Sequence, residues 1–158
     1  MYSMPKLRQA FTLIELIVVI GILSVLLTIV LVAINPARQF AQANNTKRRS
    51  DTTALLNAVH QYAADNKGVL PTGITAAALP IRLSNPADPT AESDICALIV
   101  PTYIAALPAD PLTNNGASVT ACTTAYSTGY TILKSATNNR VTVAAPAAEL
   151  SEIIAATR

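Results

Sequence analysis

Glu15 is the residue of this chain whose position most requires a specific partner. It is the only charged residue between Phe11 and Ile34, a stretch in which nearly every other side chain is apolar. A carboxylate that is removed from water without a partner is costly, so we expect Glu15 to be paired or to lie near a membrane interface. This single acid is therefore the first candidate for a functional contact.

Catalytic chemistry has little support in the rest of the sequence. His60 is the only histidine, and we interpret it as an ordinary helix-face residue. No Ser-His-Asp or Cys-His arrangement, phosphate-binding loop or two-metal carboxylate cluster is recognisable. We therefore expect no enzymatic activity, no cofactor and no metal site. An anchored soluble enzyme remains an alternative that no set of residues supports.

The apolar stretch that contains Glu15 has the length of a membrane span. From Leu16 to Ile34 there is no charge, and about 20 helical residues at roughly 1.5 Å each cross the hydrocarbon core of a bilayer. Lys6 and Arg8 precede the stretch, which places the short N-terminus in the cytoplasm and the remainder outside. An ordinary signal peptide would be cut after the apolar run, but Ile34-Asn35-Pro36 offers no small-residue site.

The order of these features resembles the class III leader of type IV pilins and of type II secretion pseudopilins. A short basic leader, residues 1–10, is followed by Phe-Thr-Leu-Ile-Glu at the start of the apolar helix. The resemblance implies that a prepilin peptidase cuts between Ala10 and Phe11 and methylates the new Phe11 amine. Ala10 departs from the glycine that is usual in the family, although alanine is the nearest residue in size.

The same resemblance implies an α+β, pilin-like fold. A long N-terminal helix would be apolar in its first half, residues 11–34, where it spans the membrane or forms a filament core. The amphipathic second half, residues 35–68, would pack on a small antiparallel β-sheet of the globular region, residues 69–158. Glu15 would pair with a Phe11 amine, its own or that of an adjacent subunit, and so set the axial register of a homo-oligomeric filament.

Periodicity within the sequence independently predicts the long helix, from residue 11 to about 66. The apolar side chains of its second half recur at three- and four-residue spacing and form one stripe: Leu55, Leu56, Val59, Tyr62 and Ala63. Gly68 is placed to take the left-handed conformation that ends a helix. Pro36 lacks a backbone donor and clashes with the preceding turn, so we predict a kink or local break near residues 32–36.

Lys47, Arg48 and Arg49 form a basic cluster between the two halves of this helix. We favour a solvated or subunit-contact face and keep a nucleic-acid contact as the alternative. The formal net charge of the chain is +2, from eleven basic and nine acidic residues. Loss of Lys6 and Arg8 with the leader would balance the side-chain charges, so a nucleic-acid partner is possible but not indicated.

Cys96 and Cys122 are the only two cysteines, and both lie in the part expected to be exported. An even count in an oxidising compartment favours one disulfide. It would close a loop of about 27 residues and contribute about 3 kcal/mol. Metal binding is the weaker interpretation, because there is no second cysteine pair and His60 is distant in sequence.

The globular region has one clear β signal and several ambiguous segments. Alternation in residues 126–145 predicts a hairpin with its turn at Asn138-Asn139. Residues 76–83 and 96–103 are short elements of either type, and the tail from Ala147 to Arg158 is a helix or the closing strand. Prolines break the loop region before them: Pro71, Pro80, Pro86 and Pro89.

Residues 103–111, which end in Leu-Pro-Ala-Asp-Pro, resemble the stretch that precedes the sheet in major pseudopilins and related pilins. Some pseudopilins bind calcium just after it, but Asp110 has no second acid nearby and a plain turn is favoured here.

Three binding or structural functions follow from the resemblance. We favour a type IV pilus subunit, which implies an assembly platform and ATPases as partners. The subunit would lie in the cytoplasmic membrane before assembly and in a surface filament afterwards, for adhesion, motility or DNA uptake. A type II secretion pseudopilin and a DNA-binding minor pilin that uses Lys47, Arg48 and Arg49 are the alternatives.

Overall fold

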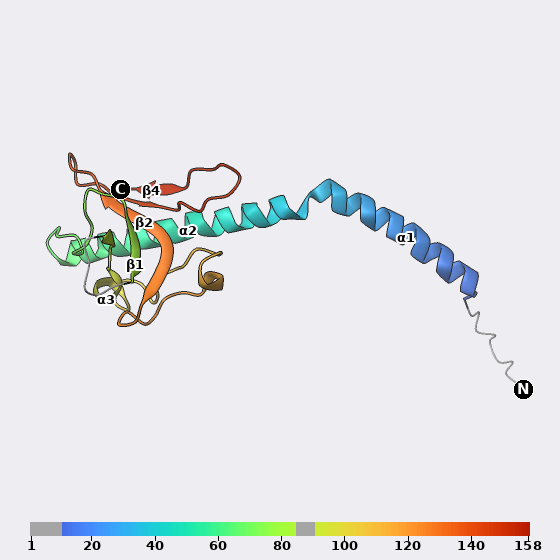
Figure 1. Cartoon of the computed structure of the whole chain (residues 1–158), viewed down its shortest axis with the longest axis horizontal. Coiled ribbons are helices and arrows are strands. Elements are labelled where there is room, and N and C mark those ends of the chain that lie inside the picture. The colour runs from blue at the N-terminus through green and yellow to red at the C-terminus, as the bar shows by residue number, and fades with distance from the viewer. Residues whose placement is uncertain (1–10, 85–90) are drawn as a thin grey trace, which may run out of the picture. The chain divides into compact units, whose positions relative to one another are not determined.

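The computed structural model describes residues 11–84 and 91–158. The chain divides into two compact units, Met1–Gln39 and Phe40–Arg158. The expected leader, residues 1–10, lies outside the described residues, and so do Ala10, Pro86 and Pro89. Most of the elements are labelled in Figure 1.

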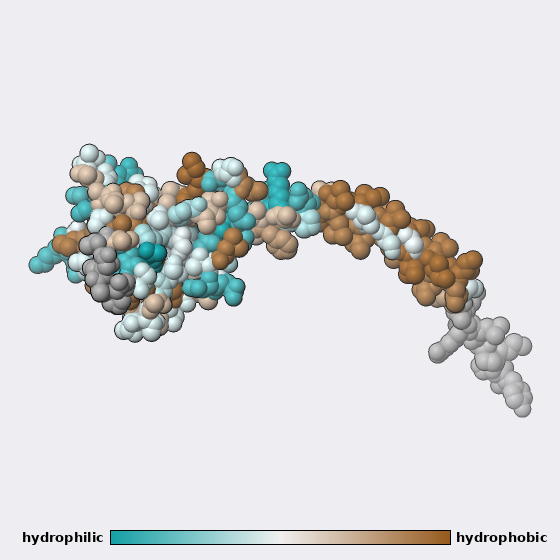
Figure 2. Space-filling view, viewed as in Figure 1, coloured by the Kyte–Doolittle hydropathy of each residue, from teal (hydrophilic) through white to brown (hydrophobic). Residues whose placement is uncertain are grey.

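Helix α1 (Leu13–Ile34) is the apolar element of the first unit. All of its 22 residues are exposed in the single chain, and by length and composition it could cross a membrane. Figure 2 shows its surface as almost continuously hydrophobic, with only a few paler patches. A helix that is apolar on every side needs lipid or other protein around it, because water solvates none of its faces well.

The helical backbone is interrupted at Asn35, which has φ 43° and ψ 80° in the left-handed region. Pro36 then begins helix α2 (Pro36–Asp65), a position at which the missing N–H is harmless. The Asn35 side-chain oxygen accepts a hydrogen bond from the Arg38 N–H at 3.3 Å and so caps the new helix. The break falls within the predicted window of residues 32–36, and one helix ends there while another begins.

The apolar stripe of α2 is buried as its spacing predicts, although Tyr62 is only partly buried. The helix ends with a hydrogen bond from the Gly68 N–H to the Ala63 carbonyl, at 2.7 Å. Lys67 (φ 57°) and Gly68 (φ 86°) both take positive φ. The left-handed terminus therefore begins at Lys67, one residue before the glycine that the sequence singles out.

Four antiparallel strands form one sheet in the order β1-β2-β3-β4. They are β1 (Leu79–Leu83), β2 (Tyr126–Lys134), β3 (Val141–Ala144) and β4 (Ala155–Thr157). The ambiguous tail thus supplies the closing strand β4. The ambiguous segment 96–103 contains the short helix α3 (Cys96–Ile99), and a 3₁₀ turn covers Asn114–Gly116. The α+β prediction is confirmed.

The core of the second unit lies between α2 and the sheet. Leu55 and Val59 from the helix pack in one cluster with sheet residues that include Ile81, Ile132 and Val143, all essentially inaccessible to solvent. Cys96 and Cys122 are joined in a disulfide with 5.3 Å between their Cα atoms. This bond ties α3 to the segment that precedes β2, and Tyr103 within the closed loop packs edge-on against Tyr62 of α2.

Candidate functional site

Glu15 closes a reciprocal hydrogen-bonded cap at the start of α1. Its Oε2 accepts from the Thr12 backbone N–H at 2.9 Å and from the Thr12 hydroxyl at 2.8 Å. The Glu15 N–H in turn donates to Thr12 Oγ1 at 3.2 Å. The cap satisfies two backbone donors that would otherwise be unpaired at a helix N-terminus. It also fixes the carboxylate within one turn of Phe11.

The cap leaves part of the Glu15 carboxylate available. Among the described residues, Oε1 accepts no hydrogen bond, and the Phe11 side chain is 90% exposed. A cationic group close to the N-terminus of α1 would be attracted by Glu15 Oε1 and repelled by the partial positive charge of the helix N-terminus. The helix end favours negative charge, so the cation would bind to Glu15 rather than to the backbone.

The remaining polar side chains of α1 need no partner outside their own helix. The Ser24 hydroxyl donates to the Ile20 carbonyl at 2.7 Å, and the Thr28 hydroxyl donates to the Ser24 carbonyl at 2.9 Å. Satisfied hydroxyls of this kind are compatible with an apolar surrounding, whether lipid or packed protein. Glu15 is therefore the residue of α1 with capacity for an intermolecular polar contact.

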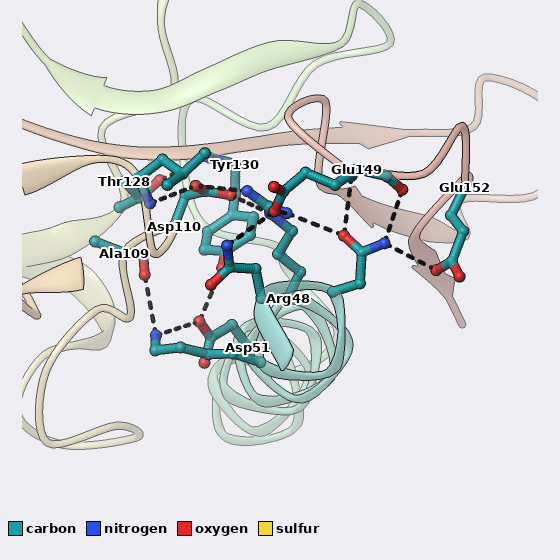
Figure 3. A network of polar contacts seen from close by, with 12 residues as sticks. Arg48, Asp51, Ala109, Asp110, Thr128, Tyr130, Glu149 and Glu152 are labelled. Atoms are coloured by element: carbon teal, nitrogen blue, oxygen red, sulfur yellow. Dashed lines mark hydrogen bonds and ion pairs between the residues drawn. The ribbon is translucent and has the colours of Figure 1, made fainter. Parts of the chain in front are cut away.

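The second unit contains a buried ionic cluster, which we call the Arg48 network (Figure 3). The Arg48 side chain is fully buried. Its Nε and Nη2 donate to the two carboxylate oxygens of Asp110 at 2.6 and 3.1 Å, a two-pronged contact. Its Nη1 donates to Glu149 Oε2 at 2.7 Å and to Asn45 Oδ1 at 2.9 Å. The guanidinium thus joins α2 to two segments that are distant in sequence.

The charges of this network stabilise one another. Hydrogen bonds to Asp110, and secondarily to Glu149, raise the pKa of Arg48 above its usual value despite burial. Hydrogen bonds from Arg48 and Asn44 hold the pKa of Glu149 below its usual value. Buried ions of this kind are tolerated only when their remaining donors and acceptors are paired, as they are here.

Asp51 extends the network one turn along α2. Its Oδ2 accepts from Lys47 Nζ at 2.7 Å and from the Tyr130 hydroxyl of β2 at 2.8 Å. Lys47 Nζ also donates to the Ala109 carbonyl at 3.0 Å. Burial, and then the hydrogen bond to Asp51, raises the pKa of Tyr130, so the phenol stays protonated and acts as a donor. The helix, the sheet and the residue 109–110 loop are therefore linked by polar contacts.

The Asn45 side chain pairs with the backbone of Glu149, which lies in the loop between β3 and β4. The two hydrogen bonds resemble those between neighbouring strands. The Asn45 side-chain nitrogen donates to the Glu149 carbonyl at 2.8 Å, and its oxygen accepts from the Glu149 N–H at 2.9 Å. The next two residues, Leu150 (φ 58°) and Ser151 (φ 57°), both take the left-handed conformation. Glu152 then pairs with Arg49 at 2.5 Å. Contacts on both sides hold this unfavourable backbone in place.

A glycine makes room for Asp110 beside the sheet. Gly129 of β2 has φ 79°, and a Cβ there would lie 2.8 Å from the Asp110 Cβ and 2.7 Å from Thr113 Oγ1. Any larger residue would push the loop away from Arg48. Both oxygens of Asp110 are already used, since Oδ1 accepts from the Leu112 N–H at 2.9 Å as well as from Arg48. The residues after Asp110 therefore form a turn without a free carboxylate at its start.

Comparison with known proteins identifies the N-terminal segment alone. A family described as the prokaryotic N-terminal methylation motif matches residues 5–31. Residues 5–31 thus match the motif found in the class III leader of type IV pilins and pseudopilins. No curated protein and no solved structure matches the chain. The motif ends within α1, so the second unit is described by its own geometry.

The methylation motif includes the residues at the start of α1. The motif implies processing by a prepilin peptidase and assembly into pilus-like polymers. Phe11 and Glu15 both lie within the matched residues. Phe11 directly precedes Thr12, whose backbone N–H and hydroxyl both donate to the Glu15 carboxylate.

The basic cluster is where the sequence interpretation fails. The favoured interpretation, a solvated or subunit-contact face, is wrong for Arg48, which is buried within its own chain between two carboxylates. Lys47 and Arg49 remain partly exposed, but each is paired with an acid of this chain. A nucleic-acid surface needs cations that are free to replace counterions, and these three are neutralised internally.

The sequence interpretation also missed Asn45, Asp51, Tyr130 and Glu149. One signal was present: the three- and four-residue spacing of the apolar stripe continues toward the N-terminus of α2 through Thr52, Arg48, Asn45 and Ala41, which are all buried. A polar residue that continues a buried stripe is a candidate for a buried polar contact. The periodicity alone could have identified these positions on α2, although not their partners.

Proposed function

We propose that this protein is a type IV pilus subunit, which polymerises through α1 into an extracellular filament. The observation that carries the proposal is Glu15 at the start of a helix that is apolar on every side, within the residues that match a methylation motif. The pattern suits a subunit that is held first in lipid and then among identical helices, because both surroundings are apolar.

Processing would create the partner that Glu15 lacks. A peptidase cut between Ala10 and Phe11 exposes an amine, and one N-methyl group leaves its positive charge in place. In the membrane Glu15 lies near the headgroups. In the filament it would be desolvated, so it would pair with a Phe11 amine, most usefully that of an adjacent subunit. Such a pair would fix the axial register of helices that could otherwise slide past one another.

The proposal places the subunit in the cytoplasmic membrane before assembly and on the cell surface afterwards. The prepilin peptidase, an assembly platform and assembly ATPases are the expected partners. The second unit would face outward and form the filament surface, because its own core is complete and needs no burial in lipid.

N-terminal mass spectrometry of filaments sheared from cells tests this proposal directly. We expect mature chains that begin at Phe11 and carry one added methyl group. Ala10→Gly should be processed at least as fast as the natural chain, and Ala10→Asp should block cutting. Mature chains that begin beyond Ile34 would indicate a conventional signal peptidase and would contradict the assignment.

A type II secretion pseudopilin is the second candidate, supported by the Leu107-Pro108-Ala109-Asp110-Pro111 segment. In this chain Asp110 serves Arg48 with both oxygens, which supports a structural use of the segment. Filaments on cells that lack any secretion operon would favour the pilus subunit. Loss of a secreted protein on deletion of this gene, without loss of surface filaments, would favour the pseudopilin.

A further inference from the structure

An open groove of about 550 Å³ lies at the end of α2 that is distant from Pro36. Its walls are His60 and Ala63 of α2, the loop of residues 68–74, Lys134 at the end of β2, and Asn139 in the turn that follows. This volume lies within the range of small-molecule sites in proteins. All of these residues belong to the second unit, so the groove exists in the folded subunit before any assembly.

His60 presents an unusual hydrogen-bonding pattern in this groove. Its Nε2 is buried and makes no hydrogen bond in the described part of the chain. The other ring nitrogen, Nδ1, is not among the buried unpaired atoms of the described residues. A buried N–H without an acceptor is costly, whereas an unprotonated nitrogen in the same place costs less. A ring that carries a proton on Nδ1 avoids that cost and has an N–H available for a ligand.

The other polar side chains of the groove, those of Thr72, Lys134 and Asn139, can each donate a hydrogen bond. The Lys134 ammonium forms no ion pair with any described residue. The Asn139 side chain supplies an amide that can donate. No Asp or Glu side chain is among the described residues that line the groove. Val69, Leu70 and Pro71 add an apolar wall on one side. The groove thus combines a free cation and neutral donors with a surface for a carbon skeleton.

We propose that this groove binds a small organic carboxylate of about the size of a sugar acid. The carboxylate would accept charge-assisted hydrogen bonds from Lys134 and a neutral one from His60 Nδ1–H, while the ligand's carbon atoms lie against Val69, Leu70 and Pro71. The inference does not rest on filament assembly, although a subunit at the cell surface would meet such ligands outside the cell.

The single histidine makes the test specific. Mature full-length protein in detergent micelles, with ¹³C-labelled histidine, gives ring signals from His60 alone. Glucuronate and acetate are the probes, glucose is the matched neutral sugar, and inorganic phosphate is the competing anion. We expect a saturable shift of the His60 signals with glucuronate, a weaker response to acetate, and no saturable shift with glucose.

Two lysine variants separate a site from general charge attraction. Lys134→Gln should weaken glucuronate binding by about tenfold or more, the usual effect of losing one charge-assisted hydrogen bond. Lys67→Gln removes the same charge from a neighbouring residue that does not line the groove, and should leave the affinity unchanged. Near-ultraviolet circular dichroism of the tyrosines checks that both variants are folded.

Three results would overturn the proposal: no saturable shift with glucuronate, equal shifts with glucose, or equal losses for the two lysine variants. A saturable response to phosphate without one to glucuronate would overturn the carboxylate assignment in favour of an inorganic anion. Because the measurements use protein in detergent micelles and not filaments, each of these results is independent of whether the chain forms filaments.

Discussion

Replacement of Arg48 by methionine tests whether the buried network holds the second unit together. Methionine keeps much of the length and the apolar stem of arginine but cannot donate a hydrogen bond. Asp110, which is 1% exposed, would lose both of its Arg48 contacts, and Glu149 would lose one. Removal of one partner from a buried ion pair typically costs about 3–5 kcal/mol, so we expect Arg48→Met to destabilise the unit by that amount.

Arg49→Met is the matched control, since it removes the same side chain one position away. Arg49 is 57% exposed and, among the described residues, forms an ion pair only with Glu152, so its loss should cost about 0–1 kcal/mol. Urea unfolding of the mature protein in micelles, followed by tyrosine near-ultraviolet circular dichroism, measures both. Equal destabilisation by the two variants, or a loss below about 1 kcal/mol for Arg48→Met, would refute the argument that the buried charges depend on this guanidinium.

Arg48→Met with Asp110→Leu provides a further check. The double variant removes the stranded carboxylate as well as the guanidinium, so it should recover part of the stability that Arg48→Met alone loses. If the double variant loses as much stability as Arg48→Met and Asp110→Leu lose separately, added together, the two residues are not energetically coupled.

Three further predictions concern acid, the disulfide and assembly. The pKa of Glu149 is lowered in the folded state, so the stabilisation that Glu149 contributes is complete above its ordinary pKa of 4.5 and is lost as the pH falls below that value. A plot of the urea midpoint against pH should therefore fall less steeply in acid for Glu149→Gln than for the natural chain. Cys96→Ser with Cys122→Ser should lower the free energy of unfolding by roughly 2–5 kcal/mol, and free thiols in native protein would contradict this. Glu15→Leu should be inserted and cut but leave monomer in the membrane with few filaments, whereas normal filament numbers from this variant alone would mean that Glu15 serves only its own helix cap.

The sequence predicts the elements whose signals are local. The apolar run predicts α1, Pro36 predicts an interruption, and alternation in residues 126–145 predicts the β2–β3 hairpin. The closing strand is different, because β4 is only three residues long and pairs with β3 across a loop. The spacing of Leu150, Ile153 and Ile154 would also suit a helix, but only Ile154 of the three is buried, and residues 155–157 pair with β3 as a strand.

The Arg48 network could not be predicted because its partners come from distant segments. Asp110 and Glu149 lie 62 and 101 residues from Arg48 in sequence. Each carboxylate taken alone looks like an ordinary loop acid, and the basic cluster taken alone looks like a solvated helix face. Only the continued periodicity of α2 indicated burial at Arg48, and periodicity carries no information about which charge will meet it.

Glu15 of α1 and the carboxylates of the second unit differ in the partners that they have within the chain. The contact proposed for assembly depends on a few residues at the start of α1, where one carboxylate, Glu15, is left with an unused oxygen. The second unit uses several of its carboxylates internally, since those of Asp51, Asp110, Glu149 and Glu152 all accept from α2 or β2 side chains. A subunit whose globular charges are satisfied within the chain presents few competing partners for an amine, so a Phe11 amine created by cleavage would be directed to Glu15.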